Sequence, residues 1–168
     1  TGLMNRRHFM QTAEMELQRA QRYRRPLTVA MADLDYFKRL NDTYGHAAGD
    51  AVLRAFAEQV RETLRQSDLV CRYGGEEFAF LFPEISPDET ARLAERLRVA
   101  CVAHAVPLPD GRSVTATVSI GLADASECPI EIALKNADEA LYEAKRLGRN
   151  RVVIGGRPPV TNPIQENP

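Results

Sequence analysis

Two short β-type runs separated by a glycine pair constrain this chain more than any other feature. The runs cover residues 69–73 and 77–82, and Gly74 and Gly75 lie between them. Because glycine reaches positive φ without a Cβ clash, the pair predicts a tight hairpin turn. Two adjacent glutamates follow the turn, although like charges side by side at a sheet edge repel each other. A metal ion would remove that repulsion, since hard cations prefer carboxylate oxygens. The alternative is a solvent-exposed hairpin whose second strand begins with polar residues.

A second acidic segment lies upstream of this hairpin. Residues 27–32 form an apolar run that ends at Asp33, and a short polar helix is expected from Tyr36. An acid at the C-terminal end of a buried strand presents its carboxylate at the rim of a sheet, where it can hold a metal ion. The alternative is that Asp33 only caps the short helix at Tyr36.

The spacing of apolar residues predicts the remaining elements. Helices are expected over residues 5–24, 49–66, 87–104 and 130–147, and strands over residues 27–34, 69–73, 77–82, 113–122 and 152–154. This order predicts an α+β fold with an antiparallel-rich sheet flanked by helices. We expect one domain over residues 1–154. Residues 155–168 hold several prolines and no apolar periodicity, which predicts a disordered tail.

Composition excludes some classes of function. The net charge of −1 over 168 residues shows no basic excess, so we expect no nucleic-acid partner. No long apolar run or signal peptide is present, so we expect no membrane contact from this chain and a cytoplasmic location. Cys71, Cys101 and Cys128 are odd in number and lack zinc spacing, which predicts free thiols, buried in the case of Cys71 and Cys101.

Several motifs, taken in order, resemble the GGDEF family of diguanylate cyclases. The glycine-pair hairpin and the Asp33 segment carry the resemblance first, with Glu76 in the third motif position. Three further segments, over residues 1–7, 117–121 and 137–150, are similar to the family's opening, its late core strand and its last helix. The resemblance implies a ferredoxin-like, nucleotidyl-cyclase-type fold. Because the chain begins inside a motif, we expect a piece of a longer protein, which could be membrane-anchored through an N-terminal region absent here.

The resemblance implies a reaction and a metal site. Two GTP molecules would give cyclic di-GMP and two pyrophosphates on a homodimer, with two Mg²⁺ ions, or Mn²⁺, in each active site. The implied metal ligands are Asp33, the backbone carbonyl of Leu34, Glu76 and Glu77. Glu76 is also the implied base, and Lys38 is implied to bind the triphosphate and stabilise the transition state. Such roles suit the chemistry, because attack on an α-phosphate requires in-line geometry and charge neutralisation.

Other phosphate contacts are implied by the same resemblance. The backbone amide of Phe37 would face the phosphates, while its ring is expected in the core. Lys145 and Arg149 match phosphate contacts of the family. Without the resemblance, both could equally be solvated partners of the dipole at a helix end.

The guanine and ribose contacts are also implied. Asn41 and Asp50 match the pair that binds the guanine edge, which an amide and a carboxylate complement. A helix cap is the alternative for Asp50. His46 lies close to the base site in the family, although a structural role is the alternative. Gly74 and Gly75 would leave room for the ribose.

A last element matches the product-inhibition site of the family. Arg65 and Asp68 have the RxxD spacing upstream of Gly74, and Arg96 matches the second arginine of that site. Arginine forks suit phosphodiester oxygens and guanine edges, and the alternative is an ordinary polar helix end. Two other functions remain open: a catalytically silent receptor of GTP or cyclic di-GMP, and a relaxed enzyme that also makes cyclic GMP-AMP.

Overall fold

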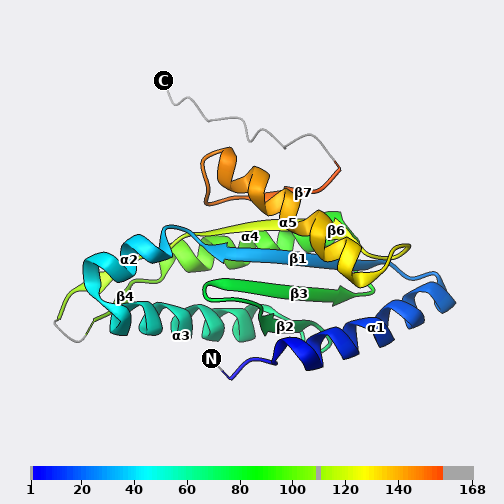
Figure 1. The fold of residues 1–168 in the computed structure, drawn as a ribbon, viewed down its shortest axis with the longest axis horizontal. Helices are drawn as coiled ribbons and strands as arrows, with labels where there is room; N and C mark the ends of the chain where they lie inside the picture. The colour runs from blue at the N-terminus through cyan, green and yellow to red at the C-terminus, as the bar shows by residue number, and fades with distance from the viewer. Residues whose placement is uncertain (1, 109–110, 157–168) are drawn as a thin grey trace.

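The computed structural model describes residues 2–108 and 111–156 (Figure 1). Its elements, in order, are α1 (Arg6–Tyr23), β1 (Leu27–Leu34), α2 (Phe37–Tyr44), α3 (His46–Thr63), β2 (Leu69–Arg72), β3 (Glu77–Pro83), α4 (Pro87–Ala103), β4 (Val106–Pro107), β5 (Ser113–Val114), β6 (Val118–Asp124), α5 (Ile130–Arg146) and β7 (Val152–Ile154). Most of the predicted tail lies outside the described residues.

A five-stranded sheet forms the centre of the molecule. Its strand order is β2-β3-β1-β6-β7, and every neighbouring pair is antiparallel except β6 and β7. A second sheet pairs only β4 with β5. The predicted α+β fold with an antiparallel-rich sheet is therefore confirmed, and the glycine-pair hairpin and the Asp33 strand are neighbours within it.

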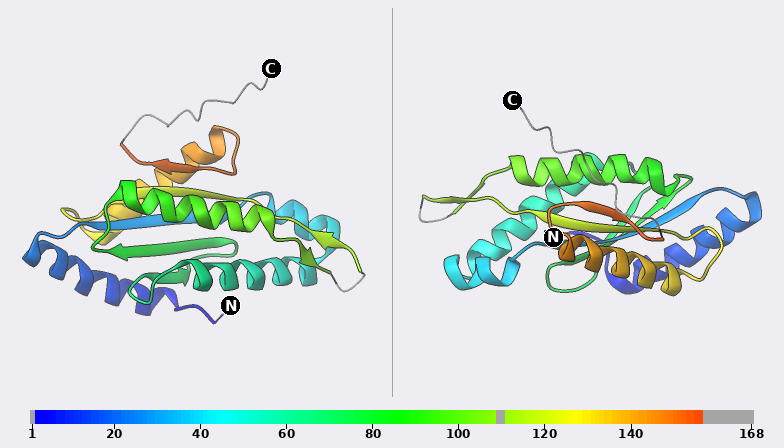
Figure 2. Two further views of the ribbon diagram at one scale, coloured as in Figure 1. Left: turned by 180° about the vertical axis from the view of Figure 1, so that it is seen from behind. Right: turned by 90° about the horizontal axis from the view of Figure 1, so that it is seen from above.

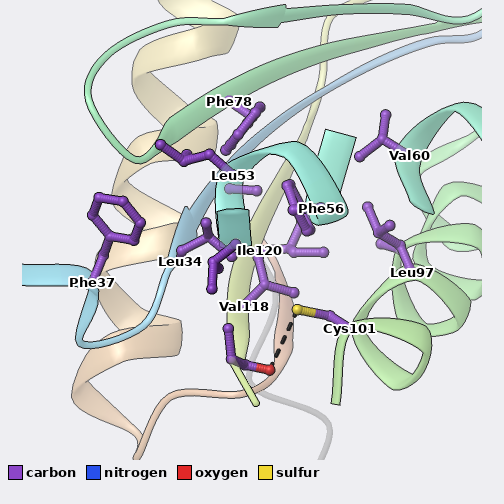
Figure 3. Close-up of a cluster of buried hydrophobic side chains, with 14 of the residues drawn as sticks. Leu34, Phe37, Leu53, Phe56, Val60, Phe78, Leu97, Cys101, Val118 and Ile120 are labelled. Atoms are coloured by element: carbon purple, nitrogen blue, oxygen red, sulfur yellow. Dashed lines mark hydrogen bonds between the residues drawn. The ribbon is translucent and has the colours of Figure 1, made fainter. Parts of the chain in front are cut away.

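Helices cover both faces of the main sheet. Figure 2 shows α4 and α5 on opposite sides of the strands. All eight residues of β1 are buried, and they alternate between two cores. Ala32 and Leu34 belong to the core with α3 and α4, which includes Phe56 (Figure 3). Val29 and Met31 belong to the core with α1 and α5. Because both faces are covered, β1 reads as a continuous apolar run.

Local sequence explains where the flanking helices begin. The side chain of Asn5 accepts a hydrogen bond from the amide of His8, which caps α1. In α4, Ser86 and Glu89 form a reciprocal capping box, and Pro87 occupies the first turn, where its missing N–H costs nothing. These caps explain why α1 and α4 follow the predicted ranges closely.

Two predicted elements differ from the structure. The single strand expected over residues 113–122 is broken, because Ser113–Val114 pairs with β4 while Val118–Asp124 pairs with β1. The helix expected over residues 49–66 begins at His46 and ends at Thr63. As a result, the RxxD element does not end a helix. Arg65 to Asp68 form a separate turn, in which the Asp68 amide donates to the Arg65 carbonyl at 3.1 Å.

The cysteines agree with the expectation of free thiols. All three cysteines are free, and Cys71 and Cys101 are buried. Burial raises the pKa of Cys71 to about 11 and that of Cys101 to about 12, so both thiols stay protonated at neutral pH. Within residues 2–108 and 111–156, none of the helices has the length and apolar character that crossing a membrane requires.

Candidate functional site

The two acidic segments meet at one end of the β1–β3 pair. Asp33 lies directly opposite Glu77 in the antiparallel register, and the Leu34 amide donates to the Glu76 carbonyl at 3.3 Å. Directly opposed residues of an antiparallel pair project to the same face of the sheet. The cap interpretation of Asp33 is wrong, because the N-cap of α2 is Tyr36 and no side chain bonds there. The acid pair is therefore a feature of the sheet itself.

A lysine from α5 neutralises part of this acid pair. The Nζ atom of Lys145 lies 3.0 Å from Oδ2 of Asp33. Burial raises the pKa of the Asp33 carboxyl, Lys145 opposes that shift, and the nearby Glu76 and Glu77 add to it. The interpretation of Lys145 as a purely solvated helix-end cation is wrong. The end of α5 brings positive charge onto the end of β1.

The donor set of this site suits a hard divalent cation. Asp33, Glu76 and Glu77 supply carboxylate oxygens at adjoining positions, which Mg²⁺ prefers. Across the described ranges, however, three or more acidic, histidine or cysteine side chains are nowhere clustered as a ready-made metal site. The ammonium of Lys145 contacts Asp33 instead, as a cation of lower charge. The donor types of these residues therefore suit a divalent metal ion, but their side chains do not converge on one position in this structure.

The glycine pair acts through space and not through its backbone dihedrals. Residues 73–76 form a loop between β2 and β3, and neither Gly74 nor Gly75 has a φ in the left-handed region, so the prediction of a positive-φ turn is wrong. A Cβ at Gly74 would collide with the Glu77 carboxylate, whereas one at Gly75 would meet nothing within 4 Å. The Arg72 guanidinium holds the loop by donating to the Gly75 carbonyl at 2.6 and 2.9 Å. Gly74 thus leaves the space that the Glu77 carboxylate occupies.

The helix α2 presents the predicted phosphate contacts. Phe37 is its first residue, and its ring is buried in the core, as expected (Figure 3). Lys38 follows and is exposed. Because the first amides of a helix lack intrahelical partners, this end of α2 has free N–H donors close to the C-terminal end of β1.

Asn41 and Asp50 lie on the two helices that pack beside each other, α2 and α3. The Oδ1 atom of Asn41 is buried and has no hydrogen-bond partner. A buried amide oxygen without a partner costs free energy, so this atom is poised to accept a bond from a ligand. Asp50 is exposed inside α3, whose N-cap is Gly45, so the cap interpretation of Asp50 is wrong. His46 is the exposed first residue of α3.

Gly49, which packs against the side-chain amide of Asn41, was not identified from the sequence patterns. A Cβ at Gly49 would collide with the Asn41 carboxamide and would lie 3.0 Å from the Phe37 ring. Only a residue without a side chain lets α2 and α3 approach this closely. Gly49 therefore determines where the Asn41 amide sits.

If Asn41 binds the guanine edge as the family resemblance implies, replacing Gly49 by alanine is expected to weaken GTP binding by about tenfold, since relieving the clash must displace the Asn41 carboxamide. Titration with GTP measures the effect, and thermal melting separates it from loss of fold. Ala47→Ser, at an exposed position in the first turn of the same helix, is the matched control. Parent-like GTP affinity in a folded Gly49→Ala variant would contradict this role.

Two further residues around the end of β1, Asp35 and Tyr36, were also missed. Asp35 is 6% exposed and accepts hydrogen bonds from Thr117, Ser119 and the amide of Asn150. Tyr36 is exposed, and the Arg149 guanidinium lies 4.6 Å from the centre of its ring. The sequence signal was the second acid of the Asp33-Leu34-Asp35 segment, but its partners are distant in the chain.

The predicted product site lies away from this end of the sheet. Oδ2 of Asp68 accepts from the Arg65 amide at 2.9 Å, while its Oδ1 atom is buried without a partner. Burial raises the pKa of this carboxyl. Hydrogen bonds from Ser86 lower the pKa of Glu89 in the first turn of α4, and the charges of Arg92 and Arg65 lower it further. Arg96, the other arginine predicted for the product site, is exposed on α4, one turn beyond Arg92.

Comparison with known proteins identifies relatives of this arrangement. The family model described as "Diguanylate cyclase, GGDEF domain" matches residues 1–151. Diguanylate cyclase DosC of Escherichia coli is 42% identical over 155 residues, which cover 92% of this chain and 34% of that protein. The chain thus spans about a third of the length of this curated relative.

Solved structures agree with the sequence comparison. The GGDEF domain of DgcB from Caulobacter crescentus, in complex with c-di-GMP, superposes with a TM-score of 0.87 at 33% identity, and the match covers 92% of each chain. The active GGEEF domain of a diguanylate cyclase from Vibrio cholerae gives a TM-score of 0.85 at 30% identity, covering 93% of this chain and 99% of that one.

Proposed function

The chain belongs to the GGDEF family of diguanylate cyclases, and from that premise we propose that it condenses two GTP molecules into cyclic di-GMP and two pyrophosphates. The observation that carries the proposal is the acid pair of Asp33 and Glu77, with the Lys145 ammonium 3.0 Å from Asp33. A silent nucleotide receptor would have no need to hold acids together at such a cost.

The reaction makes clear demands on these residues. The 3′-oxygen of one GTP forms a bond to the α-phosphorus of the other, and the bond from that phosphorus to the pyrophosphate leaving group breaks. Glu76 accepts the proton of the 3′-hydroxyl. Asp33, Glu76, Glu77 and the Leu34 carbonyl would hold two Mg²⁺ ions, or Mn²⁺, which neutralise phosphate charge and make the hydroxyl more acidic. The 3′-oxygen of the second GTP then attacks the α-phosphorus of the first in the same way, which releases the second pyrophosphate and closes the ring.

The basic residues bind and orient the triphosphate. Lys38 and the Phe37 amide approach it from the start of α2, while Lys145 and Arg149 approach from the end of α5. Lys145 exchanges Asp33 for phosphate oxygens when the nucleotide arrives. Holding the reactants in line in this way removes much of the entropic cost of reaction.

The guanine binds between α2 and α3. The unpartnered Oδ1 of Asn41 and the carboxylate of Asp50 accept from the N–H groups of the guanine edge. His46 borders the base, and Gly74 and Gly75 leave room for the ribose. Adenine lacks that donor pattern, so the site prefers GTP.

Catalysis requires two copies of the domain, since each active site binds one GTP. We place the two copies antiparallel, with the ends of β1 facing each other. A homodimer of this kind makes the specific activity depend on protein concentration.

Incubation with GTP and Mg²⁺, followed by chromatography of the products, tests the proposal. Cyclic di-GMP and pyrophosphate in a one-to-two ratio are expected. Bound GTP without turnover would instead indicate a silent receptor, and mixed cyclic GMP-AMP from GTP plus ATP would indicate a relaxed enzyme. Either result would overturn the proposed activity.

Product inhibition through the RxxD turn is the second part of the proposal. The unpartnered Asp68 Oδ1 would accept from a guanine of cyclic di-GMP, and Arg65 and Arg96 would bind its phosphates. Because these residues lie away from the acid pair, inhibition would be noncompetitive with GTP.

Replacing Arg65 by alanine is expected to raise the inhibitory concentration of cyclic di-GMP about tenfold or more, because a charged bidentate donor is lost. Rate measurements at fixed GTP and rising cyclic di-GMP give this value. Gln66→Ala in the same turn is the matched control. Unchanged inhibition in the Arg65 variant, or inhibition competitive with GTP, would contradict a separate product site.

A further inference from the structure

Asp35 is a buried carboxylate that ties three segments of the chain together. Its Oδ1 accepts from the Ser119 hydroxyl at 2.7 Å, and its Oδ2 accepts from the Thr117 hydroxyl at 2.7 Å and from the Asn150 amide at 3.0 Å. These donors come from the region of β6 and from the turn that follows α5. None of the roles assigned above uses Asp35.

Unusual backbone conformations gather around this carboxylate. Among the described residues, five that are not glycine have positive φ, and Tyr36, Arg149 and Asn150 are three of them. Such conformations persist only where surrounding contacts hold them, and they are common at functional sites. Asp35 precedes Tyr36 and binds the amide of Asn150, so one side chain restrains both strained segments.

The two strained segments also contact each other directly. The Arg149 guanidinium lies 4.6 Å from the centre of the Tyr36 ring, and its Nη1 lies 3.5 Å from the Tyr36 hydroxyl. A cation stacked on an aromatic ring in this way loses much of its rotational freedom. We call Asp35, Tyr36, Arg149 and Asn150 the Asp35 clasp.

A second contact supports the same turn from outside. Nη1 of Arg98, on α4, donates to Oδ1 of Asn150 at 2.8 Å, and Arg98 is itself paired with Glu95. The turn after α5 is thus held by its backbone amide from Asp35 and by its side chain from α4. Of these two, only the bond from Asp35 reaches the junction of β1 and α2.

We propose that Asp35 is a positioning residue that fixes Arg149, through the Asn150 amide, in the orientation that binds the GTP triphosphate. This inference rests on the proposed function, because the target of Arg149 is the nucleotide. Asp35 itself touches neither substrate nor metal. Its contribution is preorganisation, since an arginine held in place loses less entropy when it binds.

A double-mutant cycle with Arg149 tests this positioning role. Asp35→Ala and Arg149→Ala are each expected to weaken GTP binding about tenfold, and the double variant to be no more than about twofold worse than Arg149→Ala alone. Calorimetric titration with GTP and Mg²⁺ measures all four proteins. A hundredfold loss in the double variant, or parent-like binding by Asp35→Ala, would overturn the inference.

Two matched variants separate positioning from general stability. Asp35→Asn keeps the size and an oxygen for the Asn150 amide, while the Ser119 hydroxyl can turn to accept, so its GTP affinity should stay within about threefold of the parent. Ser119→Ala removes only the bond at the other oxygen and should also stay within about threefold. Binding by Asp35→Asn as weak as that of Asp35→Ala would count against the inference.

Amide hydrogen exchange in the parent protein tests the bond between Asp35 and the Asn150 amide without depending on whether any variant folds. The Asn150 amide should exchange far more slowly than the amide of the same residue in an unstructured peptide, and unprotected exchange at Asn150 would overturn the clasp. Turnover is measured separately. A parent that binds GTP but makes no cyclic di-GMP would overturn the proposed function while the cycle still tests Asp35; a parent that binds no GTP would overturn both.

Discussion

Glu76→Gln is expected to lower the rate of cyclic di-GMP formation by about 10²- to 10⁴-fold, the range attributed to a positioned general acid or base. Glutamine keeps the size of the side chain but cannot accept the proton of the 3′-hydroxyl and binds cations more weakly. Glu76 is partly exposed, and its backbone carbonyl accepts from the Leu34 amide at 3.3 Å. That backbone bond survives the substitution, so the variant should fold as the parent does.

Glu84→Gln is the matched control for this prediction. Glu84 follows the other end of the same strand, β3, where its exposed carboxylate pairs with Arg25. Losing a surface ion pair of this kind costs little, and the position is remote from the acid pair. Chromatographic rates at matched concentrations of folded protein compare the three proteins. Equal output from Glu76→Gln and the parent would remove Glu76 from the chemistry.

Local patterns predicted most of the fold because they report burial directly. Phe9, Ala13 and Leu17 form the buried stripe whose spacing predicted the helix over residues 5–24, and the apolar run of β1 ends where Asp33 begins to face the site. The break after Ser113–Val114 was missed, since it depends on which distant strand each residue pairs with. Periodicity carries no information on that choice.

The candidate site was predictable where its residues are close in sequence to a turn or a strand end. The resemblance to the family implied that Asp33 and Glu77 belong to one site, whereas their direct pairing was found only in the structure. Gly49 and Asp35 were not predictable, because each acts through atoms brought together only by the tertiary fold. The sequence indicated that glycine matters at position 74, but for the wrong reason. Glycine is required there because a Cβ would collide with the Glu77 carboxylate, and not because the backbone is left-handed.

Replacing Asp33 by asparagine should abolish turnover without lowering the stability of the nucleotide-free fold. The variant loses one carboxylate of the implied metal set, and we expect the rate to fall by at least about 10²-fold. Burial, with Glu76 and Glu77 close by, raises the pKa of Asp33 in spite of Lys145. The ionised carboxylate therefore opposes folding at neutral pH, and the neutral amide does not.

The dependence of stability on pH has a definite sign for this residue. Because the folded pKa of Asp33 lies above its ordinary value of 3.8, the folded protein holds this proton more tightly than the unfolded chain does. The Asp33 contribution is thus most favourable below pH 3.8 and is lost as the pH rises through the folded pKa. Asp33→Asn lacks this loss, so its melting temperature at pH 7 should equal or exceed that of the parent. A lower melting temperature would mean that the ion pair with Lys145 outweighs the burial of the acid, and that the site stabilises the fold instead of burdening it.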